Sequence, residues 1–338
     1  MSSTEWSEHF KFLPQGAKIQ SFIVGDHNIV LGFEDPDGYN NDFNRFFGET
    51  IGRVGNRISG ARIENLNDKS YTLHANNGSH SLHGGREGWG KKTFDGPQQV
   101  QRDGRLALHF TYLSPDGDEG YPGTVKLDVW YYPSVTKATI GKHQVVTLEI
   151  EYEAQLVGDE VEETAINVTN HSYFNISGAS TIEGTSATLS TNLHQETDNE
   201  SIPTGVIKPF PGIEKNEAFT LGSEEPDVDH CFIFNDKPKT VQLDTRSQQL
   251  EKLCEFRHSN TGIHLEALST EPAFQFYTGK YIDVPAVYGQ PARGARSGMC
   301  IEAQRYVNAI NVDDYRSMVV LRRGQTYGSR TVYRATIS

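Results

Sequence analysis

One stretch of the sequence, residues 167–178, concentrates side chains that could transfer protons and bind a polar ligand. It reads NVTNHSYFNISG, and a period of two residues divides it into two unequal faces. We expect a strand whose apolar face carries Ile166, Val168, Phe174 and Ile176, with Asn170 and Ser172 between them. The other face is wholly polar and carries Asn167, Thr169, His171, Tyr173 and Asn175. This pattern predicts the floor of a polar cleft with His171 at its centre; the alternative is a histidine held in a buried hydrogen-bond network.

Glu302 is the second residue that could do proton chemistry. It lies in GMCIEAQRY, where its neighbours Met299, Cys300, Ile301 and Ala303 are apolar. A carboxylate inside such a strand is costly to bury without a partner. Desolvation would also raise its pKa toward the range that suits a general base. The alternative is an edge strand that leaves Glu302 in solvent.

Two glycine-containing segments carry candidate ligand-binding residues. Asn56 and Arg57 lie in GETIGRVGNRI and could hold a hydroxylated ligand, although Arg57 could equally form a structural salt bridge. His83 is followed by Gly84 and Gly85, and glycines allow the backbone to approach a ligand closely.

Two later segments add an amide and a carboxylate. In AFQFYTG, Gln275 and Tyr277 share one face, while phenylalanines occupy the other. Asp229 precedes the apolar run 231–234, although an aspartate at a strand entry is ordinarily a turn residue.

Several cofactor and nucleophile motifs are absent from the sequence. It has no GxGxxG after a predicted strand, no HExxH, no paired-cysteine zinc site, no Walker loop and no GxSxG elbow. We therefore expect neither a nicotinamide cofactor nor a metal. The candidates that remain are amides, imidazoles, carboxylates, one arginine and several aromatics. That set is typical of a site for a neutral sugar.

The elements that must position these residues are predicted to be strands. In residues 125–132 and 147–153, apolar and polar side chains alternate, which indicates antiparallel strands with one wet face. Two short apolar runs in residues 17–33 are separated by Gly-Asp-His-Asn, a hairpin signal. No apolar segment keeps a spacing of 3.6 residues. We expect an all-β protein with few short helices, folded as one large β-sandwich domain over residues 1–338.

Composition narrows the choice of partners and compartment. The chain has 31 basic and 44 acidic residues, a net charge of −13, which argues against binding nucleic acid or an anionic membrane. The three cysteines are widely spaced and do not form a disulfide framework. The N-terminal residues lack the apolar region of a signal peptide, and no segment approaches membrane-spanning length. We expect a cytoplasmic protein that is a monomer or a homodimer.

These segments together resemble the galactose mutarotase (aldose 1-epimerase) family. The matching pieces include GETIGRVGNRI, SLHGG, GDEGYPG, NVTNHSYFNISG, DHCF, FQFYTG and GMCIEAQ, in the order of the family over residues 48–334. The resemblance is closest to fungal members, including the mutarotase half of their fused epimerase–mutarotase proteins; no nucleotide-binding half is present in this sequence. It implies a β-supersandwich and interconversion of the α and β anomers of free aldohexoses such as galactose and glucose, without a cofactor.

The resemblance also implies roles for individual residues. His171 matches the general acid of the family and Glu302 its general base. The positions that match substrate-binding residues are Asn56, Arg57, His83, Asp229 and Gln275, with Tyr173 added from the HSYF segment. Lys280 and Arg305 depart from the residues common in the family, which puts the sugar preference in question more than the reaction.

Three rival functions stay open on sequence grounds. A hexose-6-phosphate 1-epimerase of the same fold would need clustered basic residues; Arg293 and Arg296 are a candidate pair, but their loop PARGARSG is typical of a solvated turn. A non-catalytic sugar-binding module would not need both His171 and Glu302. A glycoside hydrolase would need two carboxylates, which Glu302 and Asp229 could supply, but would leave His171 without a role.

Overall fold

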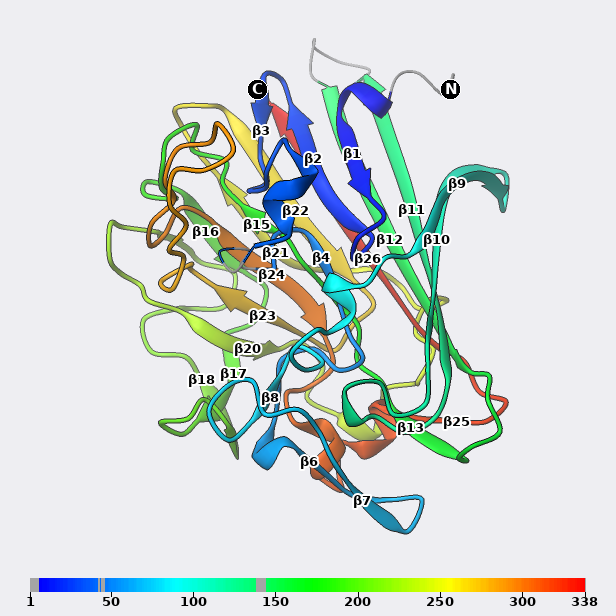
Figure 1. Cartoon of the computed structure of the whole chain (residues 1–338). Coiled ribbons are helices and arrows are strands. Elements are labelled where there is room, and N and C mark those ends of the chain that lie inside the picture. The colour runs from blue at the N-terminus through cyan, green and yellow to red at the C-terminus, as the bar shows by residue number, and fades with distance from the viewer. Residues whose placement is uncertain (1–5, 42, 44–45, 138–143, 338) are drawn as a thin grey trace.

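Two antiparallel sheets form the body of the protein in a computed structural model, which describes residues 6–41, 43, 46–137 and 144–337 (Figure 1). The larger sheet has nine strands in the order β19-β16-β21-β22-β26-β12-β11-β10-β9. The smaller sheet has six strands in the order β15-β24-β23-β20-β17-β18. Every strand pair in both sheets is antiparallel. The prediction of an all-β sandwich is confirmed.

The strands of the two main sheets have the following bounds. The nine-stranded sheet contains β9 (Asp95–Arg102), β10 (Arg105–Ser114), β11 (Val125–Lys137), β12 (Gln144–Leu156), β16 (Ser186–Leu189), β19 (Ala218–Thr220), β21 (Glu251–Arg257), β22 (Ile263–Ser269) and β26 (Tyr327–Ile337). The six-stranded sheet contains β15 (Tyr173–Phe174), β17 (Leu193–Thr197), β18 (Pro203–Pro209), β20 (Asp229–Ile233), β23 (Ala273–Tyr277) and β24 (Met299–Gln304).

Smaller sheets and short helices connect and cover these layers. The small sheets pair β1 (Phe10–Leu13), β2 (Lys18–Val24) and β3 (His27–Asn28); β4 (Glu49–Ile51) and β14 (Thr169–His171); β5 (Arg57–Ile58) and β8 (Ser81–Leu82); β6 (Arg62–Leu66) and β7 (Lys69–Thr72); and β13 (Glu163–Ala165) and β25 (Val320–Arg322). The helices in the described residues are all 3₁₀ turns of three or four residues: η1 (Trp6–Glu8), η2 (Pro36–Tyr39), η3 (Ser59–Ala61), η4 (Trp89–Lys91), η5 (Asp118–Gly120), η6 (Pro238–Thr240), η7 (Ala309–Asn311) and η8 (Arg316–Met318). None of them is long enough to cross a membrane.

The main hydrophobic core lies between the two sheets because the strands alternate as predicted. On β11, Val125, Leu127 and Val129 are buried in it. The six-stranded sheet contributes Met299, Ile301 and Ala303 of β24 from the same face. The residues between them therefore point away from the core, and Glu302 is one of these.

Glu302 lies in the interior of a sheet rather than at an edge. β24 is bordered by β15 on one side and β23 on the other, and the Glu302 side chain is 2% exposed. The alternative of a solvated edge-strand glutamate is therefore wrong.

The stretch 167–178 is not the single strand that we expected. It divides into β14, which pairs with β4, and β15, which pairs with β24. The break has a local cause: Oδ1 of Asn170 accepts hydrogen bonds from the backbone N–H of Ser172 at 3.1 Å and from its hydroxyl at 2.6 Å. Side-chain bonds of this kind compete with the strand ladder. As a result, the polar residues of the stretch do not share one continuous face.

Candidate active site

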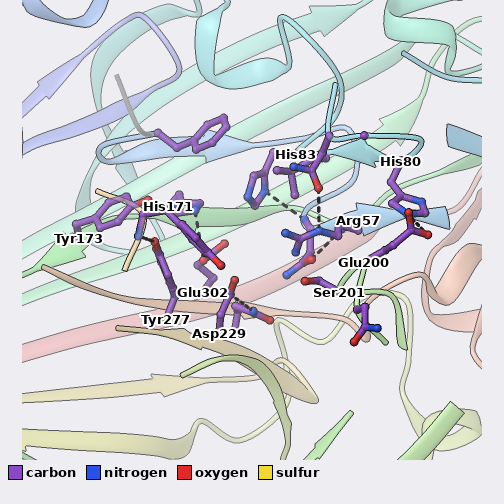
Figure 2. Close-up of a pocket in the computed structure, with 18 residues that line it drawn as sticks. Arg57, His80, His83, His171, Tyr173, Glu200, Ser201, Asp229, Tyr277 and Glu302 are labelled. Carbon is purple, nitrogen blue, oxygen red and sulfur yellow. Dashed lines mark hydrogen bonds and ion pairs between the residues drawn. The ribbon is translucent and has the colours of Figure 1, made fainter. Parts of the chain in front are cut away.

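A cavity of about 520 Å³ opens on the face of the six-stranded sheet that points away from the core (Figure 2). Strands β20, β23 and β24 form its floor, and the segment from Phe46 to His83 contributes a wall. Its lining residues are Phe46, Asn56, Arg57, Asn77, Gly78, His80, Leu82, His83, His171, Tyr173, Asn199, Glu200, Ser201, Asp229, Gln275, Tyr277, Tyr281 and Glu302. All eight site residues predicted from the sequence are among them.

The floor of the cavity follows from strand register. Gln275 on β23 lies opposite Glu302 on β24, and Asp229 lies at the start of the adjoining strand β20. The amide of Gln275 donates from Nε2 to Oδ1 of Asp229 at 2.7 Å. Among the described residues, Gln275 Oε1 and Glu302 Oε2 are buried without a hydrogen-bond partner. Both are acceptors available to hydroxyl groups in the cavity.

The wall of the cavity is a small β5–β8 ladder flanked by two residues in the left-handed backbone region. Asn56 has a φ of 58° and His83 a φ of 52°. The backbone N–H of His83 donates to the Asn56 carbonyl at 3.1 Å, and the Asn56 N–H donates to Nδ1 of His83 at 3.3 Å. A neutral His83 that accepts at Nδ1 carries its proton on Nε2. Arg57 donates from Nε to Oδ1 of Asn77 at 3.1 Å, so a side chain of the wall holds the guanidinium.

The glycines after His83 have a different use from the one expected. A Cβ on Gly84 would lie 1.9 Å from the carbonyl oxygen of Gly52. A Cβ on Gly85 would lie 2.3 Å from a carboxylate oxygen of Glu119. The expectation that these glycines admit a ligand is therefore wrong, because the close approach is made by the protein itself.

His171 and Glu302 face each other in the cavity. Nε2 of His171 lies 3.4 Å from Oε1 of Glu302, and both side chains are almost fully buried. The imidazole lies between Tyr173, stacked at a centroid distance of 4.9 Å, and Phe46 at 5.4 Å. The edge-on ring of His83 is 5.0 Å away. These rings fix the plane of His171 and direct Nε2 toward the carboxylate.

Burial shifts both groups of this pair toward their neutral forms. It lowers the pKa of His171 to about 4, an effect that the charge of Glu49 and a bond to the backbone of His171 oppose. Burial also raises the pKa of Glu302 well above its usual range; the charge of Asp229 adds to this effect and Arg57 opposes it. Between the lowered pKa of His171 and the raised pKa of Glu302, the pair therefore holds one proton. A pair of groups that holds one proton can act as an acid on one atom of a ligand and as a base on another atom.

A metal ion fits this arrangement poorly. His83, His171 and Glu302 place potential ligand atoms within 4.8 Å of one another. The 3.4 Å between Nε2 of His171 and Oε1 of Glu302 matches the spacing of neighbouring ligands on a Zn²⁺ ion with bonds of about 2.0–2.1 Å. The bond from Asn56 to Nδ1 of His83, however, leaves a proton on the nitrogen that would have to bind the metal. The trio is better suited to hydrogen bonding and proton transfer.

Of the five polar residues predicted to share the cleft floor, only His171 and Tyr173 line the cavity. Oδ1 of Asn167 accepts the backbone N–H of Arg305 at 3.0 Å, and Asn175 donates to the carbonyl of Ser297 at 2.9 Å. Because the strand is broken, the side chains of Asn167 and Asn175 form hydrogen bonds within the protein and do not face the cavity.

Sequence reasoning missed the outer part of the cavity. Asn199, Glu200 and Ser201 come from the turn between β17 and β18, and Tyr281 from the loop after β23. Nothing in their local sequence separates them from ordinary surface turns. Phe46 carried a usable signal, because it lies in a cluster with Phe43 and Phe47.

The two departures from the family pattern lie outside the cavity lining. Lys280 is exposed and pairs with Asp227. Arg305 is fully buried, and its Nε lies 3.1 Å from Oε2 of Glu271. Neither side chain lines the cavity, so neither contacts a ligand held there.

The buried Arg305–Glu271 pair predicts a large loss of stability on substitution. Arg305→Leu is expected to lower the free energy of unfolding by about 3–5 kcal/mol at neutral pH, because Glu271 would be left without its cation. Urea unfolding measures this change. The control is Arg322→Leu at the exposed pair with Glu163, for which we expect a change within about 1 kcal/mol. Equal losses in the two variants would contradict the prediction.

The same variant should show a distinct pH dependence. Burial raises the pKa of Glu271, and Arg305 opposes that rise. Without Arg305 the folded-state pKa lies higher still, so the penalty is present at neutral pH and declines as the carboxyl takes up a proton. The stability difference between wild type and Arg305→Leu should therefore be smaller at pH 5 than at pH 7.5.

Arg293 and Arg296, the candidate phosphate-binding pair, both donate hydrogen bonds to backbone carbonyls of the protein. Arg296 is buried, which corrects the expectation of a solvated turn, and donates to the carbonyls of Gly222, Glu224 and Pro226. Arg293 donates to the carbonyl of Gly32 at 2.6 Å. Neither arginine lines the cavity.

Comparisons with known sequences give consistent matches over nearly the whole chain. A family model described as aldose 1-epimerase matches residues 5–334. The bifunctional protein GAL10 of Pachysolen tannophilus is 38% identical over 324 residues, which are 94% of this chain and 44% of that protein. Galactose mutarotase of Mus musculus is 32% identical over 327 residues, which are 92% of this chain and 84% of that protein. The chain thus spans less than half the length of its bifunctional relative.

Solved structures share the fold. A GalM/aldose epimerase homologue from C. elegans matches with a TM-score of 0.80 and 25% identity, covering 97% of this chain and 96% of that one. Galactose 1-epimerase from Lactobacillus acidophilus matches with a TM-score of 0.75 and 20% identity, covering 96% and 90%. At that lower identity the second match concerns the fold alone.

Proposed function

This chain belongs to the aldose 1-epimerase family, and we propose that it interconverts the α and β anomers of free aldohexoses such as galactose and glucose. The resemblance inferred from sequence motifs, including the one to fungal fused proteins, is confirmed. The observation that carries the proposal is the buried His171–Glu302 pair, 3.4 Å apart and open to the cavity. An acid and a base at this separation can reach two oxygens bound to one carbon.

The proposed reaction moves one proton off the sugar and one onto it. Glu302 takes the proton of the anomeric hydroxyl while His171 donates from Nε2 to the ring oxygen. The bond between C1 and the ring oxygen breaks, and C1 becomes an aldehyde carbon. Rotation about the bond from C1 to C2 then presents the other face, and the ring closes with both proton transfers reversed. The sum of protons is unchanged, so the reaction consumes nothing.

The remaining cavity residues would hold the sugar while C1 turns. Asp229 and Gln275 offer a fixed pair of acceptors on the floor, and Arg57 and His83 offer donors from the wall. Asn56 supports that wall, and Tyr173 packs against the reacting imidazole. Holding the open chain in place keeps its aldehyde carbon and attacking hydroxyl oriented toward the two proton-transfer groups during ring closure.

The proton shared by the pair predicts a broad, bell-shaped pH profile for kcat/KM. Below the His171 pKa of about 4, a second proton binds and no base remains. Above the raised pKa of Glu302, the last proton leaves and no acid remains. We therefore expect the acid limb near pH 4, well below the 6.5 of a free imidazole. Polarimetric rates across pH measure it; an acid limb near 6.5 would contradict it.

The proton shared by His171 and Glu302 lies on a different residue in the resting site than the proposed mechanism requires. Burial favours neutral His171 and protonated Glu302, whereas ring opening requires the proton on His171. The two forms have the same total charge and differ by one transfer over 3.4 Å. A hydrogen bond from a bound hydroxyl and the positive charge of Arg57 would stabilise the carboxylate, so we place this transfer after sugar binding.

Polarimetry tests the proposed function directly. Freshly dissolved α-D-galactose should relax to the equilibrium rotation faster with the protein than in buffer alone. A panel of single-anomer aldoses would then give the preferred sugar. A relaxation rate equal to the spontaneous one, for every sugar in the panel, would reject the proposal.

The charges of the cavity favour a neutral sugar over a hexose 6-phosphate. Of the described lining residues, Arg57 carries the permanent positive charge, against the three carboxyl groups of Glu200, Asp229 and Glu302. A phosphate site typically clusters basic groups. Inhibition of galactose mutarotation by glucose 6-phosphate would support the phosphate alternative.

Comparing sugar binding with the rate of mutarotation distinguishes a non-catalytic sugar-binding module from an enzyme. Sugar binding in calorimetry without any rate above the spontaneous background would establish it. The costly burial of Glu302 beside His171 favours turnover, because binding alone does not need that pair.

We further propose that residues 1–338 act as one mutarotase-like domain in the cytoplasm, as a monomer or a homodimer. The three free and buried cysteines support a reducing compartment. The net charge of −13 supports a small-molecule substrate over nucleic acid.

A further inference from the structure

The second nitrogen of the His171 ring has a protein partner. Sγ of Cys300 lies 3.6 Å from Nδ1 of His171. Cys300 lies on β24, two residues before Glu302, and opposite Tyr173 of β15 in the strand register. Its side chain is fully buried and does not line the cavity. One strand therefore supplies groups to both nitrogens of the imidazole, Glu302 at Nε2 and Cys300 at Nδ1.

A buried thiol is a suitable acceptor for an imidazole N–H. Burial raises the pKa of Cys300 well above its usual range, and Glu302 and Asp229 add to that effect, so the group stays a neutral thiol. Thiol sulfur accepts hydrogen bonds weakly. A carboxylate in this place would add a charge beside Glu302 and would hold His171 in its charged form. The thiol can therefore orient the ring without making His171 a poor acid.

The contact at one ring nitrogen decides which nitrogen transfers protons. We propose that Cys300 is a positioning residue for His171, whose Nδ1–H it accepts so that Nε2 alone gives and recovers the catalytic proton. The Nε2–H bond of the imidazolium breaks as the bond from hydrogen to the sugar ring oxygen forms, and the neutral imidazole keeps its Nδ1–H. This inference rests on the proposed function.

The other groups around His171 do not replace this contact. Phe46 and Tyr173 pack on the ring faces, and His83 lies edge-on. Glu49, opposite His171 in the β4–β14 pair, acts through its charge and is itself paired with Lys91 and Lys18. A bond to the backbone of His171 also contributes, so removal of the thiol should weaken the orientation rather than abolish it.

Three cysteine variants test the proposal. Cys300→Ala removes the acceptor, and Cys300→Ser keeps an acceptor of similar size. Cys254→Ala is the matched control, because Cys254 is equally buried but lies in β21 of the nine-stranded sheet, away from the cavity lining. For each variant we would measure kcat and KM by polarimetry, the melting temperature, and the ¹⁵N shifts of the His171 imidazole, assigned with His171→Asn.

The expected results differ between the variants. Cys300→Ala should lower kcat about fivefold to tenfold with KM unchanged, the size expected for one weak hydrogen bond to the reacting group. Its ¹⁵N shifts should move toward a mixture of the two neutral tautomers, whereas the wild type shows protonated Nδ1. Cys300→Ser should stay within threefold of wild-type kcat, and Cys254→Ala within twofold.

Several outcomes would overturn the proposal. They are wild-type kcat and ¹⁵N shifts in Cys300→Ala, an equal loss of kcat in Cys254→Ala, or a wild-type ring protonated at Nε2 alone. If Cys300→Ala does not fold, Cys300→Ser decides, and a kcat as low as that of His171→Asn would count against the proposal. If the wild type lacks mutarotase activity, the proposed function fails, but the ¹⁵N shifts still test the contact.

Discussion

Replacing Glu302 with glutamine is expected to lower kcat for galactose mutarotation by about 10²-fold or more, the usual effect of removing a positioned general base. The amide has almost the same shape as the carboxyl group but cannot take the proton of the anomeric hydroxyl. KM should change little, because Asp229, Gln275 and the wall residues still hold the sugar. Polarimetry with fresh α-D-galactose at saturating concentration measures the change.

The stability of Glu302→Gln should separate lost chemistry from lost fold. Burial raises the pKa of Glu302 in the folded protein above its unfolded value, so burying this group costs folding free energy at neutral pH, where the unfolded chain holds it ionised. A neutral amide does not carry that cost, and the variant should melt at the same temperature as wild type or higher. Glu255→Gln on the nine-stranded sheet is the control and should keep wild-type kcat. A wild-type rate in Glu302→Gln would remove Glu302 from the mechanism.

The sequence predicted the parts of this protein that depend on local pattern. Alternation in residues 125–132 and 147–153 matches β11 and β12, because a long strand with one face in the core must repeat every two residues. The same rule located Gln275 and Glu302, which lie on the outer face of strands whose inner faces carry Phe274, Phe276 and Ile301. Burial on one face of a strand is visible in sequence.

Where the structure differs from the sequence-based predictions, the cause is a side-chain hydrogen bond or a contact between residues far apart in the sequence. The break between β14 and β15 depends on the hydrogen bonds from Ser172 to Asn170. The alternating pattern does not show whether an asparagine within it will make such bonds. Arg296 looked like a turn residue because its partners are backbone carbonyls of residues 222–226, far away in sequence. The outer lining at Asn199, Glu200 and Ser201 exists only because the turn after β17 folds over the cavity.

Replacing His171 with asparagine is expected to lower kcat about 10²-fold or more as well, because burial lowers the pKa of the neighbouring His83 well below its usual value and makes it a poor replacement acid. Asparagine is a neutral polar residue, so β14 can keep its pairing with β4. The measurement is the same polarimetric assay, with kcat and KM determined separately. Relaxation of α-D-galactose at the wild-type rate would refute the assignment.

The residual rates of the two variants should depend on pH in opposite directions, and this tests the roles more sharply than the size of the loss. In His171→Asn the remaining group is Glu302, a base only when ionised, so the residual rate should rise as pH increases toward its raised pKa. In Glu302→Gln the remaining group is His171, an acid only when protonated, so the residual rate should rise as pH falls toward about 4. Parallel pH slopes in the two single variants would show that the acid and base roles are not divided between these residues.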